Sequence, residues 1–332
     1  MAVSLLCVIA PTALARDLGP LVKKQKLTLI NITSASGGDT GGAEAINDDG
    51  LIVGYANSSF GSNSYNAFAY DLTLGFRFLP SLPGGRNTSA VSINKQGQSV
   101  GGTEVNHEAR ALLWEKSGEL VELHPGAEWT SSGAFSINDN GEVLGYARTP
   151  PLEVQFIWSA ESGYSYFTNL GLAGLNKHGN VIGIDETGWF YAESLDQAPL
   201  YVTLPENYGV FRFLTDNRLI VGLYQNDAGY QQAFRYRPNG KIVPLENLPG
   251  TPGSFPLSAN DRNQIVGMPD ATVGAALWEG NKVYNLNDLI KPGSDWRILT
   301  RASGINNRGW IVGGGNTTNT SAGYLLRPKV DD

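Results

Sequence analysis

The stretch INDDGLIVG, residues 46 to 54, decides the fold because related stretches follow it six more times along the chain. Most copies place an aliphatic residue and Asn before a short polar turn and a central Gly, and every copy ends in a second Gly that follows an aliphatic residue. Their spacing of 38 to 47 residues is typical of four-stranded propeller blades. The copies are INDDGLIVG, INKQGQSVG, INDNGEVLG, LNKHGNVIG, LTDNRLIVG, ANDRNQIVG and INNRGWIVG, with anchor residues Asn47, Asn94, Asn138, Asn176, Thr215, Asn260 and Asn306.

Each copy predicts a β-hairpin, because two short apolar runs flank a polar turn. The central Gly, for example Gly50 or Gly141, supplies the positive φ that the last turn position needs. Asn263 replaces this Gly in the sixth copy and tolerates the left-handed conformation. Arg218 replaces it in the fifth copy, where we expect a shifted turn because long side chains rarely adopt positive φ.

A third strand follows each hairpin and ends in a large side chain. These residues allow an aromatic cage, but their recurrence in every repeat favours packing between neighbouring sheets. They are Tyr70, Trp114, Trp158, Tyr191, Tyr236, Trp278 and Leu326.

A fourth strand follows only six of the seven hairpins, with segments such as FRFLPSL and VYNLNDL. The missing one is found before the first hairpin, in LTLINIT at Leu27 to Thr33. Pairing it with the last repeat would remove an exposed sheet edge. The sequence therefore predicts an all-β, seven-bladed β-propeller of four-stranded blades, over residues 27–328, whose last blade is closed by the N-terminal strand.

The chain begins with MAVSLLCVIAPTALA, an uncharged apolar run that ends in small residues before Arg16. This pattern predicts a secretory signal peptide over residues 1–15, followed by a linker over 16–26 and a short tail over 329–332. The run is shorter than the roughly 20 residues that span a bilayer, so no membrane span is expected. Cleavage would remove Cys7, the only cysteine, so no disulfide framework is expected. We expect a secreted, periplasmic or cell-surface protein.

Composition argues against an intrinsically disordered chain and against a nucleic-acid-binding protein. Hydrophobic residues make up 41% of the chain, which contains 7 Trp, 14 Tyr and 12 Phe, so it can bury enough apolar surface to fold. Its 24 basic and 31 acidic residues give a net charge of −7, and no basic cluster stands out. Nucleic acid is therefore not an expected partner.

The repeats resemble the HAF family of bacterial extracellular repeats. The resemblance rests on the hairpin phrase, on third strands such as AFAY at Ala67 and AFRY at Ala233, and on the ending LPSLPGG at Leu79. The sequence departs from that family in having Asn66 or Gln232, where the family has His, before Ala-Phe. The resemblance implies secretion and a repeat fold, and it implies no particular reaction.

Loop length separates scaffold from variable surface. The distance from the second hairpin Gly to the third-strand residue varies from 8 residues in the fourth repeat to 16 in the first, whereas the hairpins have constant length. Variable loops on a rigid scaffold are common binding sites. The loops are Ser58 to Asn66, Glu104 to Arg110, Arg148 to Glu153, Asp185 to Thr187, Gln225 to Gln231, Pro269 to Val273 and Asn316 to Ala322.

Asp185 and Glu186 occupy the shortest of these loops, which we expect to lie low near the propeller axis as the floor of an open groove. Trp189 is either part of that floor or core, because it aligns with Phe68. His107 beside Glu108 is the one pair in a variable loop that suits general acid-base or metal chemistry. The candidate ligand-binding residues are Asp185, Glu186, Trp189, His107, Glu108, Arg110 and Glu153.

No motif indicates a cofactor, a metal site or a catalytic nucleophile. Asp48, Asp49 and Asp139 lie in tight turns, where Asp commonly caps its own backbone. A calcium site there would lack the alternating acidic ligands of a calcium loop.

Two functions remain open. The first is a non-catalytic binding, adhesion or structural protein whose variable loops contact an extracellular protein or a glycan. The second is a hydrolase or lyase acting on an extracellular polymer, with carboxylates such as Glu153, Asp185 and Glu186 around the axis. Carboxylates that converge at the channel mouth would favour the enzyme, and the oligomeric state is left open.

Overall fold

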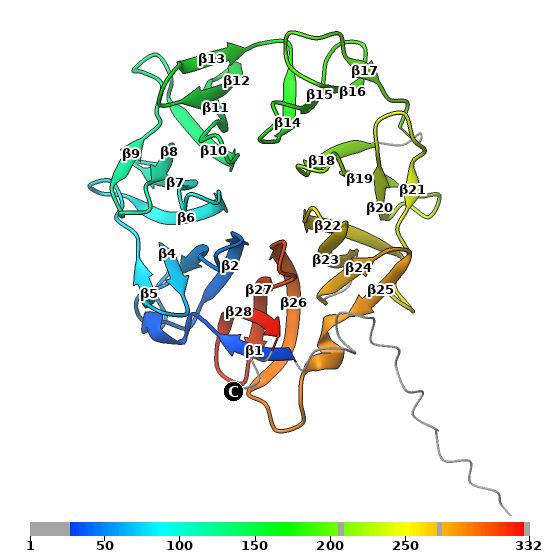
Figure 1. Ribbon diagram of the computed structural model, residues 1–332. Coiled ribbons are helices and arrows are strands. Elements are labelled where there is room, and N and C mark those ends of the chain that lie inside the picture. Colours follow the sequence, from blue (N-terminus) through cyan, green and yellow to red (C-terminus); the bar gives the residue numbers. More distant parts are fainter. Residues whose placement is uncertain (1–26, 205–208, 271–273, 329–332) are drawn as a thin grey trace, which may run out of the picture.

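The computed structural model describes residues 27–204, 209–270 and 274–328, which form a closed ring of seven blades around a central channel (Figure 1). Each blade is a four-stranded antiparallel sheet whose first strand lines the channel and whose fourth strand lies at the rim. This confirms the predicted fold class. The only helical segments among these residues are two 3-10 turns, η1 (Ser34–Ser36) and η2 (Leu286–Leu289). No helix in the described part of the chain is long and apolar enough to cross a membrane.

The strands of the first four blades follow the repeats in order. Blade 1 contains β2 (Gly41–Ile46), β3 (Ile52–Ala56), β4 (Asn66–Asp71) and β5 (Gly75–Phe78). Blade 2 contains β6 (Arg86–Ile93), β7 (Ser99–Val105), β8 (Glu108–Trp114) and β9 (Leu120–Glu122). Blade 3 contains β10 (Ser131–Ile137), β11 (Val143–Thr149), β12 (Leu152–Ser159) and β13 (Gly163–Phe167). Blade 4 contains β14 (Gly171–Leu175), β15 (Val181–Ile184), β16 (Trp189–Ala192) and β17 (Leu200–Tyr201).

The remaining blades follow the same plan, except that the last uses both ends of the described chain. Blade 5 contains β18 (Val210–Leu214), β19 (Ile220–Gln225), β20 (Gln231–Tyr236) and β21 (Val243–Pro244). Blade 6 contains β22 (Gly253–Ala259), β23 (Gln264–Asp270), β24 (Ala276–Glu279) and β25 (Lys282–Asn285). Blade 7 contains β26 (Trp296–Ile305), β27 (Ile311–Thr317), β28 (Ser321–Pro328) and β1 (Leu27–Asn31).

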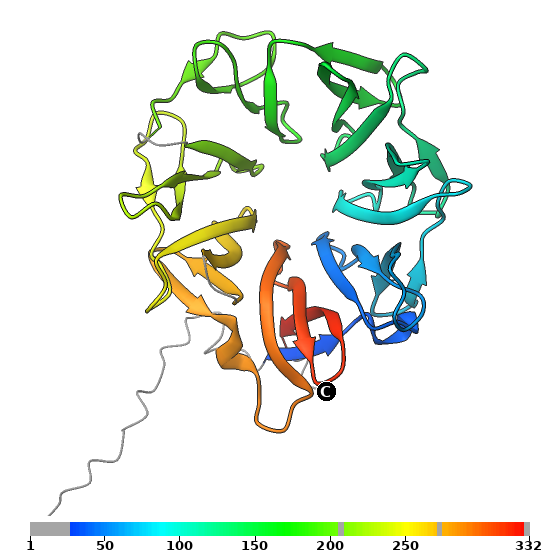
Figure 2. The same ribbon diagram turned by 180° about the vertical axis from the view of Figure 1, so that it is seen from behind.

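The N-terminal strand closes the ring as predicted. β1 pairs antiparallel with β28, from Leu27 opposite Pro328 to Asn31 opposite Tyr324. The contact continues beyond the strand, where the backbone N–H of Gly323 donates to Thr33 Oγ1 at 2.9 Å. Figure 2 shows from behind that the first and last described strands lie side by side. The two ends of the propeller therefore hold each other through one sheet.

The large third-strand residues form the core between blades, which confirms the packing interpretation over the aromatic cage. Trp114 is fully buried against Val53 and Leu79 of blade 1. Its indole Nε1–H donates to the carbonyl of Pro80 at 2.7 Å, so the ring also ties blade 2 to the rim of blade 1. Trp278 makes the equivalent bond to the carbonyl of Glu246 at 2.7 Å.

Blade 4 departs from the predicted alignment by one residue. Val181 pairs with Ala192, just as Ile52 pairs with Tyr70 in blade 1, so Ala192 and not Tyr191 occupies the repeated third-strand position. Likewise Phe190, not Trp189, is the counterpart of Phe68, because each lies opposite the second Gly of its hairpin. Because successive side chains of a strand point to opposite faces of the sheet, a shift of one residue places each side chain on the other face.

The turn at Arg218 is not shifted, contrary to expectation. Its backbone N–H donates to the carbonyl of Thr215 at 3.1 Å, the same bond that Gly141 makes to Asn138. Arg218 simply adopts a φ of 64°, close to the 61° of Asn263 and the 78° of Gly141. The repeated hairpin geometry therefore overrides the local preference of the arginine.

Candidate functional site

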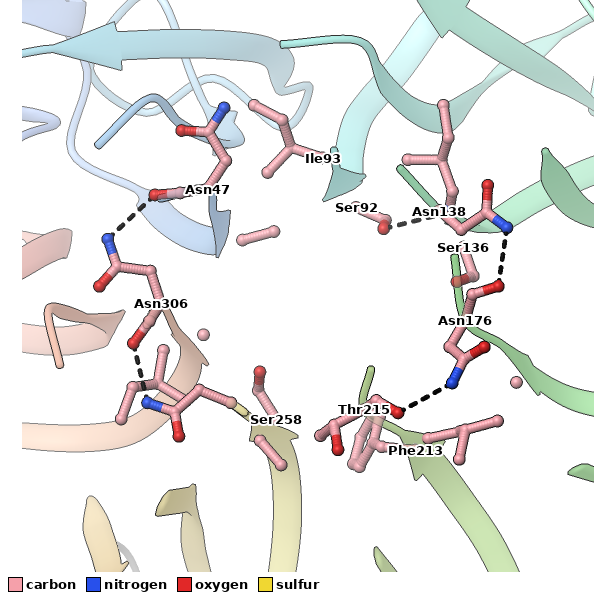
Figure 3. Close-up of a pocket in the computed structure, with 18 of the residues that line it drawn as sticks. Asn47, Ser92, Ile93, Ser136, Asn138, Asn176, Phe213, Thr215, Ser258 and Asn306 are labelled. Carbon is pink, nitrogen blue, oxygen red and sulfur yellow. Dashed lines mark hydrogen bonds between the residues drawn. The ribbon is translucent and has the colours of Figure 1, made fainter. Parts of the chain in front are cut away.

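The central channel is the candidate site, a cavity of about 610 Å³ lined by the first strand of every blade (Figure 3). The ring has two faces, and the residues that line the cavity run from the middle of each first strand toward the hairpin face. The hairpin face carries the turns between first and second strands and between third and fourth strands. The loop face carries the connections between second and third strands, residues 57–65, 106–107, 150–151, 185–188, 226–230, 271–275 and 318–320. Residues 271–273, part of one predicted loop, lie outside the described residues.

The anchor asparagines form a hydrogen-bonded belt around the channel near the hairpin face. In each case the side-chain Nδ2–H donates to the backbone carbonyl of the next anchor, as from Asn138 to Asn176 at 3.1 Å (Figure 3). The belt closes across the chain ends, because Asn306 donates to the carbonyl of Asn47 at 2.9 Å. The Oδ1 atom of the same side chain caps its own turn, as when Asn138 accepts from the N–H groups of Asn140 and Glu142 at 3.0 Å. One amide thus holds one turn and joins two blades.

The belt has a single break among the seven described anchors, at Thr215. Its hydroxyl accepts from the N–H of Leu219 at 3.0 Å and so replaces the cap, but it has no amide to reach Asn260. Asn217 joins blades 5 and 6 instead, by donating its Nδ2–H to the carbonyl of Asp261, the residue that follows the anchor Asn260. The link between blades 5 and 6 is therefore displaced toward the hairpin face.

Aspartates at the hairpin mouth bind the neighbouring blade and not their own turns, which corrects the expectation for Asp48 and Asp139. Asp139 accepts from the N–H of Lys95 at 2.9 Å, and Asp48 accepts from the N–H of Asn307 at 2.7 Å. Asp49 lies 3.9 Å from Arg308 across the same boundary. In the described residues, no group of three or more His, Cys, Asp or Glu side chains is arranged to hold a metal ion. These carboxylates are thus part of the blade-to-blade scaffold.

A β-bulge interrupts the first strand of every blade three residues before the anchor, and its side chain enters the channel wall. A bulge bends a strand and redirects a side chain, here at equivalent depth in each blade. The residue type differs in all seven blades although the anchor and its aliphatic neighbour recur. The bulge residues are Glu44, Val91, Phe135, Ala173, Arg212, Leu257 and Ser303.

The two charged bulge residues have different environments. Glu44 is half-buried and forms an ion pair with Arg301 of blade 7, whose Nε–H also donates to Ser303 at 3.0 Å. Burial raises the pKa of Glu44, and the Arg301 guanidinium opposes that rise. Arg212 is exposed to the channel, and its guanidinium lies over the rings of Phe213 and Phe255.

None of the seven candidate residues named from sequence lines this channel, all of them being described in the structure. Asp185 lies on the loop face between β15 and β16, separated from the channel by β14 (Figure 1). Its carboxylate accepts from the N–H groups of Thr187 and Gly188 and from the hydroxyl of Tyr201 at 2.7 Å. The bond from Tyr201 is the main reason that the pKa of Asp185 lies below its ordinary value. The position near the axis expected for this loop is therefore wrong.

The expected shape of the groove also changes. Blade 4 is short because β15 and β16 have only four residues each, against seven in β7 and β8, and not because its loop is the shortest. The shortest connections are those at 106–107 and 150–151. Trp189 is half-buried and packs edge-on against Phe211 at 5.4 Å, which supports the core interpretation.

The remaining candidates lie on blades 2 and 3, and the pair proposed from sequence is rearranged. His107 is 94% exposed and its Nδ1 lies 3.3 Å from Glu104, not beside Glu108. Glu108 instead pairs with Arg110 at 2.7 Å. Glu153 is exposed on β12 opposite Arg148. A general acid-base pair of His107 and Glu108 is thus not assembled.

Sequence reasoning missed the bulge residues because a bulge changes which side chain faces the channel without changing the repeat length. Two signals were present. The position three residues before each anchor carries a different residue type in all seven repeats, and Arg212 is a lone charge within the apolar run VFRFL.

Comparisons with known proteins show the fold and nothing narrower. No protein-family model and no curated protein match the chain. A catalytically inactive virginiamycin B lyase from Staphylococcus aureus, solved with quinupristin, is 13% identical with a TM-score of 0.54, over 92% of this chain and 99% of that one. A streptogramin B lyase is 12% identical with a TM-score of 0.55, over 91% and 98% of the two chains.

A third similar structure is the β-propeller domain of the Trilobed protease from Pyrococcus furiosus. It is 12% identical with a TM-score of 0.59, over 88% of this chain and 96% of that one. That domain is described as having an open velcro topology. In the present chain β1 instead closes the ring.

Proposed function

We propose that this chain is a secreted, non-catalytic binding protein that contacts an extracellular protein through its loop face. The observation that carries the proposal is the exposure of large apolar side chains at the tips of that face. Phe60 is 79% exposed in the long connection of blade 1, and Leu152 is 65% exposed beside the connection of blade 3. Ile184 and Tyr230 are exposed at the corresponding edges of blades 4 and 5.

Apolar tips favour a protein partner over a glycan. Phe60 and Leu152 carry no hydrogen-bonding group, whereas sugar hydroxyls require donors and acceptors around them. Aromatic side chains such as those of Phe60 and Tyr230 are enriched in protein interfaces. A glycan remains the second ligand class, and the polymer-active enzyme is disfavoured because the hairpin-mouth carboxylates hold neighbouring backbone and Glu44 is paired with Arg301.

Secretion is the other part of the proposal, and its signal lies in residues 1–15, outside the described residues. Cleavage after Ala15 predicts that the exported protein starts at Arg16. Mass spectrometry of the N-terminal peptide from the culture medium or periplasm would measure this directly. Recovery of the protein only inside the cell would contradict the proposal.

The binding face can be tested with two matched single variants in blade 1. Phe60 on the loop face and Leu74 on the hairpin face are 79% and 77% exposed, so replacing either with Ser removes a similar apolar surface. We would probe arrays of purified extracellular proteins and of glycans with the labelled chain. Loss of a bound protein with Phe60→Ser, but not with Leu74→Ser, is the expected result.

Other outcomes decide against parts of the proposal. Loss of binding with Leu74→Ser alone would place the partner on the opposite face. Binding confined to the glycan array would favour the second ligand class. Cleavage of a bound polymer would favour the enzyme.

A further inference from the structure

The channel contains a cation whose charge the described protein does not neutralise. Arg212 makes no hydrogen bond or ion pair with any described residue. Its guanidinium carbon lies 5.1 Å from the ring centre of Phe255 and 5.6 Å from that of Phe213. Partial desolvation by the channel wall lowers the pKa of Arg212, and no described carboxylate opposes this shift.

The equivalent position in blade 1 shows the alternative arrangement. Glu44 occupies the same bulge and is paired with Arg301 from the neighbouring blade. The charges of Glu44 and Arg301 cancel, which leaves Arg212 as the uncompensated charge at this depth of the channel. Arg212 is exposed to the channel, and its guanidinium lies beside two rings and no described carboxylate, so it is open to an anionic partner.

Part of the channel wall that faces Arg212 of blade 5 is apolar. Val91 of blade 2 lies across the ring from it, next to the paired Glu44 of blade 1, and Phe135 of blade 3 lies two blades away along the wall. Val91 and Phe135 are each 37% exposed. Figure 3 shows Ser136 and Ser258 beside the opening, where their hydroxyl groups supply additional hydrogen-bonding atoms. A volume of about 610 Å³ lies within the range of small-molecule sites, roughly 300–1,000 Å³.

We propose that the channel binds a small organic anion, whose oxyanion group pairs with Arg212 and whose aromatic or other apolar body packs against Phe135 and Val91. The planar guanidinium matches a carboxylate, sulfate or phosphate, because it can donate two parallel hydrogen bonds to any of them. Its stacking on Phe213 and Phe255 holds the side chain in place before the ligand arrives. This site is separate from the loop-face surface and does not depend on the function proposed above.

The hairpin mouth carries paired charges. Asp48, Asp139, Asp216 and Asp261 line that end of the cavity, where Lys95 lies 3.8 Å from Asp139 and Lys177 lies 2.9 Å from Asp216. These lysines offset part of the acidic charge at the mouth, whereas Arg212, deeper in the channel, has no such ion pair with a described residue.

The proposal can be tested with two dyes that differ in one charged group. Anilinonaphthalene sulfonate carries a sulfonate on the same arylamine body as the neutral N-phenylnaphthylamine, and both fluoresce more strongly in apolar sites. We expect one sulfonate dye per chain. Arg212→Gln should weaken its binding by about tenfold or more while changing binding of the neutral dye by less than about twofold. Phe135→Ala should weaken both dyes.

Arg235→Gln is the matched control, because Arg235 lies on β20 away from the channel and bonds to the carbonyl of Gly280 at 3.0 Å. It should leave both dyes unaffected. Should Arg212→Gln not fold, Arg212→Met, which keeps aliphatic contact with the rings, provides the same comparison. Failure of the wild-type protein to bind the sulfonate dye would overturn the proposal. The proposal would also be overturned if wild type and Arg212→Gln bound the sulfonate dye with equal affinity. It would be overturned too if Arg212→Gln weakened binding of the sulfonate and the neutral dye by the same factor.

Discussion

The anchor asparagine shows how a single side chain can serve two levels of structure. Its oxygen caps the turn in which it lies, and its amide N–H groups reach the backbone of the next blade. Asp has no side-chain N–H to donate. Thr215 still caps its own turn through its hydroxyl, but it has no amide that could donate to the next blade. The recurrence of Asn therefore follows from the need for an acceptor and a donor at one buried point.

Removing this side chain should be costly. Asn138→Ala would leave the N–H groups of Asn140 and Glu142 without their acceptor at a site that is only 7% exposed. It would also remove the bond to the next blade at the carbonyl of Asn176, which would keep only the bond from the N–H of Gly179. We expect the free energy of unfolding to fall by about 2–4 kcal/mol in urea denaturation. Thr215→Asn should raise it by about 1 kcal/mol, because it completes the belt. A larger loss for Thr215→Asn than for Asn138→Ala would show that the belt does not stabilise the ring.

The second Gly of each hairpin is required by close approach between strands. A Cβ atom at Gly313 would lie 2.1 Å from the carbonyl oxygen of Arg301, whereas one at the adjacent Gly314 would have no neighbour closer than 3.6 Å. Gly313→Ala should therefore lower the free energy of unfolding by about 1–3 kcal/mol. Gly314→Ala in the same strand should change it by less than about 0.5 kcal/mol. Thermal denaturation of the two variants would measure the difference, and similar melting temperatures would contradict the steric explanation.

At the scale of the element, the hairpin imposes its geometry on whatever sequence occupies it. Gly141 has a φ of 78°, and Arg218 has a φ of 64° in the equivalent turn. A β-branched side chain resists this region more strongly than a linear one. The element therefore stores strain at Arg218 that glycine avoids elsewhere.

This strain makes opposite predictions for two substitutions. Gly141→Val should lower the free energy of unfolding by roughly 1–3 kcal/mol. Arg218→Gly should raise it by about 0.5–1 kcal/mol, because relief of the left-handed conformation exceeds the small value of an exposed ion pair to Glu193 at 3.0 Å. Denaturation curves would measure both. Effects of the same sign would contradict the turn geometry.

At the scale of the whole molecule, closure depends on one short strand. β1 covers the edge of β28, and the Asn306–Asn47 bond joins the same two ends of the ring on the channel side. Without β1 the edge of β28 would present unpaired backbone groups to solvent and to other chains.

A pair of truncations would test this closure. A chain that starts at Leu27 retains β1, and a chain that starts at residue 35 lacks it. We expect the shorter chain to melt at least about 10 °C lower and to aggregate at concentrations where the longer one stays monodisperse. Scanning calorimetry and light scattering would measure these effects. Coincident melting curves would show that β1 does not hold the ring closed.

The sequence by itself determined the repeat, the number of blades and the closing strand. Strand periodicity, turn glycines and repeat spacing can be read from the sequence because they do not depend on how the blades contact one another. The belt asparagines and the core residues Trp114 and Trp278 were also visible as recurring positions, although the bond that each makes to its neighbour was not.

The tertiary structure alone decided which side chains meet. Asp139 caps Lys95 in another blade, and the one-residue shift in blade 4 moves Trp189 and Tyr191 away from their expected positions. Arg212 enters the channel because a bulge changes the alternation of its strand. These outcomes depend on bulges and on contacts between blades. Side chains alternate between the two faces of a strand, so each inserted residue moves the side chains that follow to the opposite face. The local sequence also does not specify which residue of the neighbouring blade a side chain will contact.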